Sequence, residues 1–139
     1  MIDEKVPQEE VSNRKTELPL LFKNFKKTFG ENVKGPVGNE SNEYKVTFKA
    51  GFLLDAVKFL YLRGITHLAA IHYWETENNI NFAYHFIAKI GKEHLDSKIT
   101  LIVYLPKVKK SIKSISKYYA NAGFFENEIH QKFEVEFEK

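Results

Sequence analysis

The stretch ITHLAAIHYWETENNINFAYHFIAKIGKEHLDSKITLIVYLP, residues 65–106, contains the patterns that predict the fold. Ile65–Trp74 is rich in β-branched, aromatic and small residues, and Ile80–Lys89 has an apolar side chain at alternate positions. Both patterns are typical of β-strands. The polar residues Glu75–Asn79 separate the two segments, so we expect a hairpin or meander. Lys98–Leu105 is apolar on both faces, which indicates a central strand.

The residues before this stretch predict one more strand and two helices. Glu43–Lys49 alternates apolar and polar side chains, as a half-buried strand does. Apolar residues recur at helical spacing in Phe52–Arg63, and Gly64 is suited to end that helix in a left-handed conformation. Residues 18–29 repeat an apolar side chain every fourth position and predict a short amphipathic helix. The Gly, Pro and Asn of residues 30–42 predict a loop.

The residues after this stretch predict further helices. Val108, Ile112 and Ile115 stand at helical spacing, which predicts a helix that runs to Tyr119. A last short helix is expected between residues 124 and 133. Together the patterns predict an α+β fold, with a mainly antiparallel sheet of about four strands, helices packed on one face and a C-terminal helix.

Length and composition bound the organisation of the chain. Its 139 residues fit one domain, which we place at residues 18–139, because residues 1–17 lack apolar periodicity and predict a flexible tail. No apolar run approaches the ~20 residues that span a bilayer. The polar N-terminus differs from a signal peptide. We therefore expect a soluble, cytoplasmic chain that reaches a membrane only through partners.

The residue types limit the chemistry. The chain has no Cys, which excludes disulfides, thiolate metal sites and cysteine-ligated iron–sulfur clusters on this chain. The sequence contains neither a Gly-x-Ser-x-Gly nucleophile motif nor a phosphate-binding Gly-rich loop. We therefore expect no catalytic and no cofactor-binding residues.

The histidines allow a metal hypothesis. His67 and His72 stand at odd spacing on one predicted strand, so we expect them on opposite faces. His72 and His85 are candidate cross-strand neighbours and form the one plausible two-histidine constellation. With no Cys and no obvious Asp nearby, surface histidines without a metal are the favoured interpretation. A small histidine–metal protein remains the third alternative for the whole chain.

A lysine-rich segment, residues 107–117, permits a nucleic-acid-binding function as the main alternative. An RNA-binding sheet would combine such lysines with exposed aromatic side chains for base stacking. Candidate stacking residues in the predicted strands are Tyr73, Trp74, Phe82 and Tyr84. The net charge of +3 is small for such a protein, and aromatic residues at alternate strand positions usually belong to the core.

The C-terminal segment, KYYANAGFFENEIHQKFEVEFEK over residues 117–139, gathers aromatic residues among glutamates. So many rings cannot all reach one core, and exposed aromatics among polar groups are typical of a partner interface. A well-packed final helix followed by a terminal strand would explain them equally well. The candidate interface residues are Tyr118, Tyr119, Phe124, Phe125, Glu126, Glu128, His130, Phe133 and Phe137.

Ser114–Glu138, SISKYYANAGFFENEIHQKFEVEFE, resembles the signature of the 30-kDa subunit of respiratory complex I. Tyr119 stands at the family's Trp position, and Glu126 and Glu128 stand at its two Glu positions. Later apolar positions of the pattern are occupied by Ile129, Phe133, Val135 and Phe137. The order of the preceding strands and helix is compatible with the same family from about Leu18 to the end of the chain.

Several positions depart from the family pattern. Asn127 replaces Arg, His130 replaces Tyr, Gln131 replaces Asp and Glu134 replaces Gly. The sequence stops at Lys139, where quinone-reducing members continue with a Gly-His-Pro stretch. We therefore expect the short form, similar to the equivalent subunit of membrane-bound [NiFe]-hydrogenases and related ferredoxin-dependent complexes.

The resemblance implies a non-catalytic scaffold that binds no cofactor. Family members pack against the 49-kDa subunit, which is similar to the hydrogenase large subunit, and lie near a small iron–sulfur subunit. Iron–sulfur clusters are accordingly expected on partner subunits, and the complex at the cytoplasmic side of the membrane. Glu126 and Glu128 are expected either in interface ion pairs or as caps in the first turn of the last helix.

Overall fold

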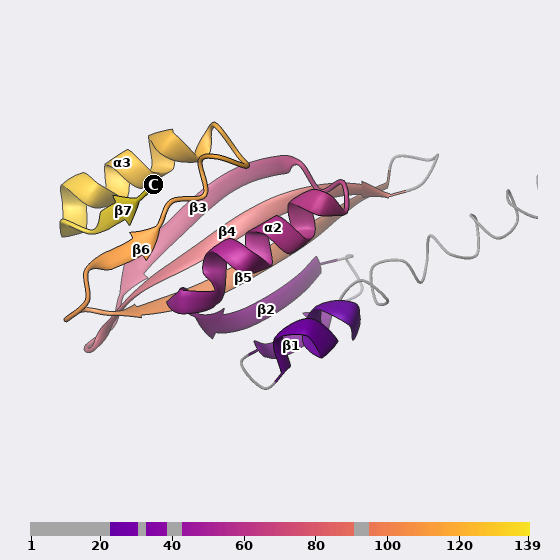
Figure 1. Ribbon diagram of the computed structural model, residues 1–139, viewed down its shortest axis with the longest axis horizontal. Coiled ribbons are helices and arrows are strands. Elements are labelled where there is room, and N and C mark those ends of the chain that lie inside the picture. The colour runs from indigo at the N-terminus through magenta and orange to yellow at the C-terminus, as the bar shows by residue number, and fades with distance from the viewer. Residues whose placement is uncertain (1–22, 31–32, 39–42, 91–94) are drawn as a thin grey trace, which may run out of the picture.

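Five strands form one sheet (Figure 1). The structure, a computed structural model, describes residues 23–30, 33–38, 43–90 and 95–139, so the predicted tail over residues 1–17 lies outside the described residues. The strands are β1 (Val33–Gly38), β2 (Glu43–Lys49), β3 (His67–Glu75), β4 (Asn79–Ile90) and β5 (Leu95–Pro106). Their spatial order is β1-β2-β5-β4-β3.

The strand pairing is mixed but mainly antiparallel. β2 runs parallel to β5, with Val46 opposite Leu101, and the other neighbouring strands are antiparallel. The four predicted strands and the α+β class are therefore confirmed. β5 lies in the middle of the sheet, as its apolar faces predict.

The prediction of a loop over residues 30–42 is wrong, because residues 33–38 form β1 at the edge of the sheet. The pairing of β1 with β2 shifts register between Lys34 and Val37, and Pro36 lies inside this irregularity. An edge strand tolerates a proline because one side of its backbone needs no partner strand. The same Gly and Pro residues that suggest a loop are compatible with this position.

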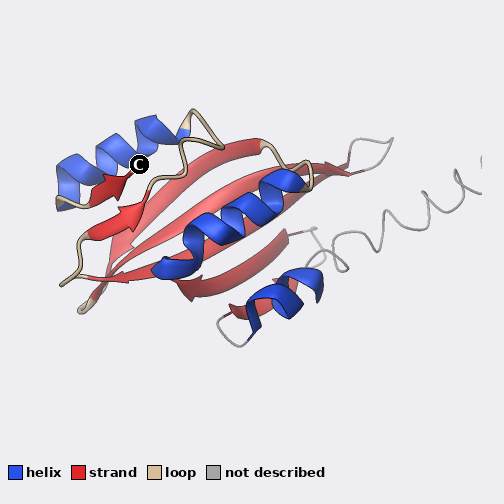
Figure 2. Ribbon diagram, viewed as in Figure 1, coloured by secondary structure: helices blue, strands red, loops and turns tan. Residues whose placement is uncertain are grey.

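One face of the sheet is covered by helices (Figure 2). These are α2 (Leu53–Leu62), entered through the short 3₁₀ helix η2 (Ala50–Phe52), α3 (Ala122–Phe133), and a helix over residues 23–29. The predicted helices over residues 52–63 and 124–133 are confirmed, as is the described part of the one predicted over residues 18–29. The core between these helices and the sheet includes Phe25, Phe48, Leu60, Phe82, Tyr84, Phe86 and Leu101, all of them buried.

The predicted left-handed end of α2 is present. Gly64 has a φ of 87°, a conformation that costs glycine little. The N–H of Ile65 donates to the carbonyl oxygen of Leu60 at 3.1 Å, and the N–H of Gly64 donates to that of Tyr61 at 3.1 Å. These two hydrogen bonds satisfy the last carbonyl oxygens of the helix, and the chain then turns into β3.

The predicted helix from Val108 to Tyr119 is wrong. The segment contains turns and the strand β6 (Ser111–Lys113), which pairs in parallel with β7 (Glu136–Glu138). Val108 is 94% exposed, so it does not share a buried face with Ile112. Lys110 has a φ of 49°, which a right-handed helix cannot contain. The pairing with β7 therefore determines the conformation of this segment.

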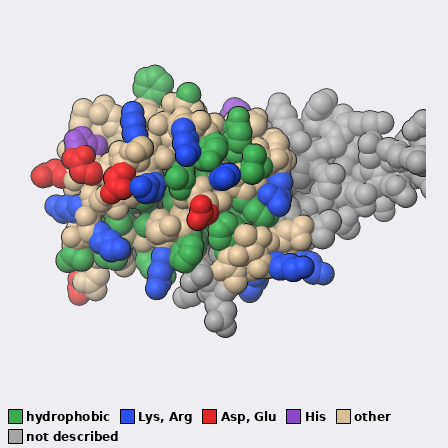
Figure 3. Space-filling view, in the orientation of Figure 1, with side chains coloured by type: hydrophobic (Ala, Val, Ile, Leu, Met, Phe, Trp, Pro, Cys, Tyr) green, Lys and Arg blue, Asp and Glu red, His purple; other side chains and the backbone are tan. Residues whose placement is uncertain are grey.

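The other face of the sheet, which we call the open face, is not covered by any helix of the described residues. Its side chains alternate with those that enter the core. They include Lys45, Lys49, His72, Trp74, His85 and Lys98. On the helix-covered face, Lys and Arg side chains are spread over the surface rather than gathered in one patch (Figure 3).

Candidate partner interface

The predicted interface residues lie on α3, on the turn before it and on β7. α3 ends at Phe133, and the next residue, Glu134, reverses the chain with a φ of 59°. The N–H of Glu134 donates to the carbonyl oxygen of His130 at 2.7 Å. β7 then returns along the same side of the molecule to pair with β6 (Figure 1). The final helix and terminal strand that one interpretation of this segment required are therefore both present.

Glu126 is in the interior rather than at the surface. Its side chain is 4% exposed and accepts hydrogen bonds from the Ser114 hydroxyl at 2.7 Å and the Ile115 N–H at 2.9 Å. Burial raises the pKa of this carboxyl, and the bonds from Ser114 and Ile115 oppose that effect only in part. Glu126 thus joins α3 to the segment after β6.

Neither glutamate caps α3. The first turn of this helix contains no acidic residue, so the predicted capping role of Glu126 and Glu128 is wrong. Glu128 is exposed and accepts a hydrogen bond from the Tyr73 hydroxyl at 2.6 Å, which raises the pKa of Tyr73. It therefore fixes α3 on β3 instead.

Tyr119 is also buried, with 2% of its surface exposed. Its hydroxyl donates to the carbonyl oxygen of Ile65, and burial raises its pKa above the ordinary value. Tyr118 lies beside it at the end of α2, with its ring centroid 5.2 Å from that of Tyr61. The turn before α3 is thus anchored on both α2 and the start of β3.

Three more rings of the C-terminal segment are half-buried against the core. Phe133 meets Tyr73 edge-on, with the ring centroids 5.6 Å apart, and the centroid of Phe137 is 6.2 Å from that of Phe82. Phe125 packs against the same core. Most of the aromatic residues in this segment therefore hold α3 and β7 in place.

Phe124 differs from the other rings. It is 81% exposed on the first turn of α3, although it is a large apolar side chain. His130, on the same helix, is also exposed, and its Nδ1 donates to the carbonyl oxygen of Val135 at 2.8 Å. Of the nine predicted interface residues, Phe124, Glu128 and His130 are the exposed ones.

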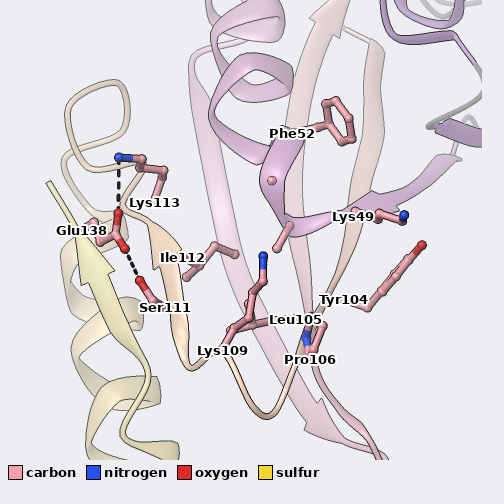
Figure 4. Close-up of a pocket in the computed structure, with 12 residues that line it drawn as sticks. Lys49, Phe52, Tyr104, Leu105, Pro106, Lys109, Ser111, Ile112, Lys113 and Glu138 are labelled. Carbon is pink, nitrogen blue, oxygen red and sulfur yellow. Dashed lines mark hydrogen bonds and ion pairs between the residues drawn. The ribbon is translucent and has the colours of Figure 1, made fainter.

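A cleft of about 510 Å³ lies between η2 and the β6–β7 pair (Figure 4). Its β7 wall carries Glu138, which accepts a hydrogen bond from Ser111 and pairs with Lys113 at 3.3 Å. These contacts lower the pKa of Glu138. Lys49 and Lys109 also line the cleft and form no ion pair with the described residues; in Figure 4 the Lys49 side chain points away from the β6–β7 pair. The remaining side-chain lining is mainly apolar and consists of Phe52, Tyr104, Leu105, Pro106 and Ile112.

This cleft could not be predicted from the sequence, since its walls come from segments that are distant in the chain. Lys49 precedes η2, Tyr104 and Pro106 end β5, and Glu138 belongs to β7. Only the β6–β7 pairing brings Glu138 opposite η2. The predicted helix over residues 107–119 would have removed that pairing.

On the open face, His72 and His85 are cross-strand neighbours, as predicted. Nδ1 of His72 lies 3.1 Å from Nε2 of His85, and Nδ1 of His85 lies 3.0 Å from Oγ1 of Thr100. Burial, together with the positive charges of Lys98 and Lys45 and the neighbouring His72, lowers the pKa of His85 to about 4. His85 is therefore neutral at pH 7.

The prediction that His67 and His72 point to opposite faces is wrong. The β3–β4 register shifts between Leu68 and Ala70, and Leu68 and Ile71 are both buried despite their odd spacing. Such a bulge inserts one residue into the strand and reverses the alternation beyond it. His67 and His72 therefore both lie away from the core. Within the described part of the chain, no group of three or more His, Asp or Glu side chains is arranged to hold a metal ion.

Comparison with known protein families assigns the chain to one family. The family model described as the 30-kDa subunit of respiratory-chain NADH dehydrogenase matches residues 46–139. No curated protein matches the sequence. A solved structure of a trypsin-resistant fragment (1–134) of Nqo5 is 17% identical, with a TM-score of 0.70, and the match covers 87% of this chain and 95% of that one.

A second solved structure is the membrane-bound sulfane sulfur reductase, described as an archaeal respiratory membrane complex. One of its chains is 19% identical with a TM-score of 0.71, and the match covers 88% of this chain and 71% of that one. At these identities the two structures show a shared fold. No helix within the described residues is long and apolar enough to cross a bilayer.

Proposed function

Because the chain belongs to the family of the 30-kDa subunit of respiratory-chain NADH dehydrogenase, we propose that it is a non-catalytic structural subunit of a membrane-bound multisubunit oxidoreductase. The complex is of the hydrogenase type or the complex-I type. This chain docks the subunit that resembles the hydrogenase large subunit, near a small iron–sulfur subunit. It lies in the peripheral arm at the cytoplasmic side of the membrane.

The absence of cysteine supports a role without bound clusters. Iron–sulfur clusters need thiolate ligands in almost all proteins, and this chain offers none. Electron transfer therefore belongs to partner subunits that carry the clusters. What this chain contributes is contact surface.

The exposed ring of Phe124 is the observation that carries the docking proposal. A phenylalanine that is 81% exposed leaves a large apolar ring in water, and a partner that covered this ring would gain the free energy of its burial. Aromatic anchors at the centre of an interface typically fill a pocket of the partner and contribute most of the binding energy. Phe124 lies within the segment that most resembles the family signature.

The test is co-purification of the complex from membranes through a tag on this chain. We expect Phe124→Ser to reduce the recovery of the large subunit by at least about tenfold, the loss that corresponds to about 1.4 kcal/mol. Val108→Ser is the matched control, because Val108 is 94% exposed but lies in the turn after β5. Full recovery with Phe124→Ser, or an equal loss with Val108→Ser, would contradict the docking site.

Point substitutions are better suited to this test than a truncation after Tyr119. Such a truncation would remove α3 and β7, and with them Ala122, Ile129 and Val135 of the core. The shortened chain would lose its partners through unfolding even if α3 touched no other subunit. A near-UV circular dichroism spectrum of each point variant verifies that the core is intact.

The alternative of a nucleic-acid-binding module is weakened by the positions of its aromatic residues. Phe82 and Tyr84 are fully buried, and Tyr73 packs against Phe133. Of the four candidate stacking residues only Trp74 is exposed. Lys107 is paired with Glu75 at 2.9 Å, which further reduces the positive charge available for phosphate groups.

A further inference from the structure

Two imidazole rings converge on the open face. In the β3–β4 register His72 is opposite Ala83 and His85 is opposite Ala70, so the two histidines are diagonal neighbours. Their ring centroids are 4.6 Å apart, and the ring planes are inclined by 67°. Nδ1 of His72 and Nε2 of His85, 3.1 Å apart, face each other directly.

This separation suits a shared metal ion as well as a shared proton. Imidazole nitrogens bind zinc at ~2.0–2.1 Å, so two such ligands at angles of roughly 90–109° lie about 2.9–3.4 Å apart. The observed 3.1 Å falls within that interval. An ion can thus replace the bridging hydrogen at the observed nitrogen separation once the two rings turn so that both lone pairs point to it.

Thr100 supplies the support that a ligating histidine needs. Its hydroxyl oxygen is 3.0 Å from Nδ1 of His85, and the residue is 2% exposed, so its position is fixed by packing. Metal-bound histidines usually donate their second ring N–H to such an oxygen, which selects the tautomer and orients the ring. With the proton on Nδ1, the lone pair of Nε2 points towards His72.

The surroundings determine which ions can bind. Hard cations such as Mg²⁺ and Ca²⁺ need several oxygen ligands, and the two histidines offer ring nitrogens instead. A pair of imidazoles suits borderline ions, in the order Cu²⁺ above Ni²⁺ and Zn²⁺.

We propose that His72 and His85 form an open site for one divalent transition-metal ion, with Thr100 as the positioning residue for His85. The described residues supply two ligands, so water or a group from a partner subunit occupies the remaining coordination positions. The site is independent of the docking role of Phe124 and goes beyond it.

The test is titration of the full-length, metal-free chain with Cu²⁺ and with Zn²⁺, followed by calorimetry and, for Cu²⁺, by electron paramagnetic resonance. We expect one ion per chain, tighter binding of Cu²⁺ than of Zn²⁺, and hyperfine structure from two imidazole nitrogens. His72→Gln and His85→Gln should each weaken binding by about 10–100-fold or more. His67→Gln, an exposed histidine of the same strand, is the matched control and should leave binding unchanged.

Two outcomes would overturn the site. One is the absence of a binding event, and the other is unchanged affinity in a His72→Gln, His85→Gln double variant, which would assign the ion to another part of the chain. Thr100→Val separates orientation from ligation, since it retains both rings and nearly the same volume. It should weaken Cu²⁺ binding by about 10–100-fold, and an unchanged affinity would remove the role given to Thr100.

Discussion

At the residue scale, polar groups inside the core determine how the C-terminal segment is held. Glu126 accepts two hydrogen bonds from the segment after β6, and Tyr119 donates one to the end of the α2–β3 connection. Tyr84 has a fully buried hydroxyl that finds no partner among the described residues. Glu126 and Tyr119 are hydrogen-bonded and Tyr84 is not, so substitutions at these residues should have different effects on stability.

Glu126→Gln should lower the free energy of unfolding by about 1–3 kcal/mol. The glutamine side chain has one acceptor oxygen, whereas the Ser114 hydroxyl and the Ile115 N–H each donate to a separate oxygen of Glu126. The pKa of Glu126 is raised by burial, so the folded protein binds more protons here than the unfolded chain. Its contribution to stability is therefore fully present at low pH and falls as pH rises through the raised pKa. Urea unfolding from pH 4 to 7 should show that this slope is absent in Glu126→Gln.

Glu128→Gln is the control on the same helix. Glu128 is exposed, and a glutamine oxygen can still accept the hydrogen bond from Tyr73. We expect a change within about 0.5 kcal/mol. A larger loss for Glu128→Gln than for Glu126→Gln would contradict the assignment of Glu126 as the buried link.

Removing the hydroxyl group from each of two buried tyrosines should change the free energy of unfolding in opposite directions. Tyr84→Phe removes an unpaired buried hydroxyl and should raise the free energy of unfolding by up to about 1 kcal/mol. Tyr119→Phe leaves the carbonyl of Ile65 without its donor and should lower it by about 1–3 kcal/mol. Thermal unfolding of both variants is the measurement, and a loss of stability in Tyr84→Phe would mean that its hydroxyl is hydrogen-bonded.

At the scale of elements, local pattern predicts the structure where the partner is near in sequence. The hairpin of β3 and β4 and the helix α2 follow from alternation, helical spacing and Gly64. Residues 107–119 could not be predicted in this way, because their strand pairs with β7 after a whole intervening helix. The bulge after Leu68 likewise changes which side chains of β3 face the core, and no residue pattern in the sequence indicates its position.

Two glycines provide a test of backbone conformation at helix ends. A Cβ added at Gly123 or at Gly64 would meet no atom within 4 Å, so a steric clash cannot account for any difference between the two alanine variants. Gly123 is inside α3, and Gly123→Ala should raise the free energy of unfolding by about 0.4–1 kcal/mol. Gly64→Ala should lower it by about 1–2 kcal/mol, because φ is 87° there. Chemical denaturation of both variants checks the sign, and a gain for Gly64→Ala would contradict the left-handed end of α2.

At the scale of the whole molecule, the two faces of the sheet carry different side chains. The helix-covered face contains the core, whereas the open face carries the histidine pair and several lysines. The C-terminal segment could be identified from sequence as the distinctive part, and the exposed Phe124 belongs to it. Which rings point inward could not be predicted, since that depends on the anchoring of Tyr119 and on the reversal at Glu134.

The core should be independent of metal ions, because it consists of apolar side chains and internally bonded polar groups. Treatment of the full chain with a chelator should therefore leave its melting temperature unchanged. Added Cu²⁺ should raise the melting temperature of the wild type but not that of the His72→Gln, His85→Gln variant, since a ligand that binds the folded state stabilises it. A fall in melting temperature with chelator alone would contradict this independence.

The parallel pairing of β2 with β5 has a consequence for synthesis on the ribosome. Val46 is translated well before Leu101, its partner in the sheet, and α2, β3 and β4 are all made between them. The β1–β2 hairpin therefore cannot join the sheet until β5 has emerged. Non-local pairings of this kind slow folding and leave strand edges exposed to aggregation in the meantime. The nascent chain should thus depend on chaperones most during the interval between β2 and β5.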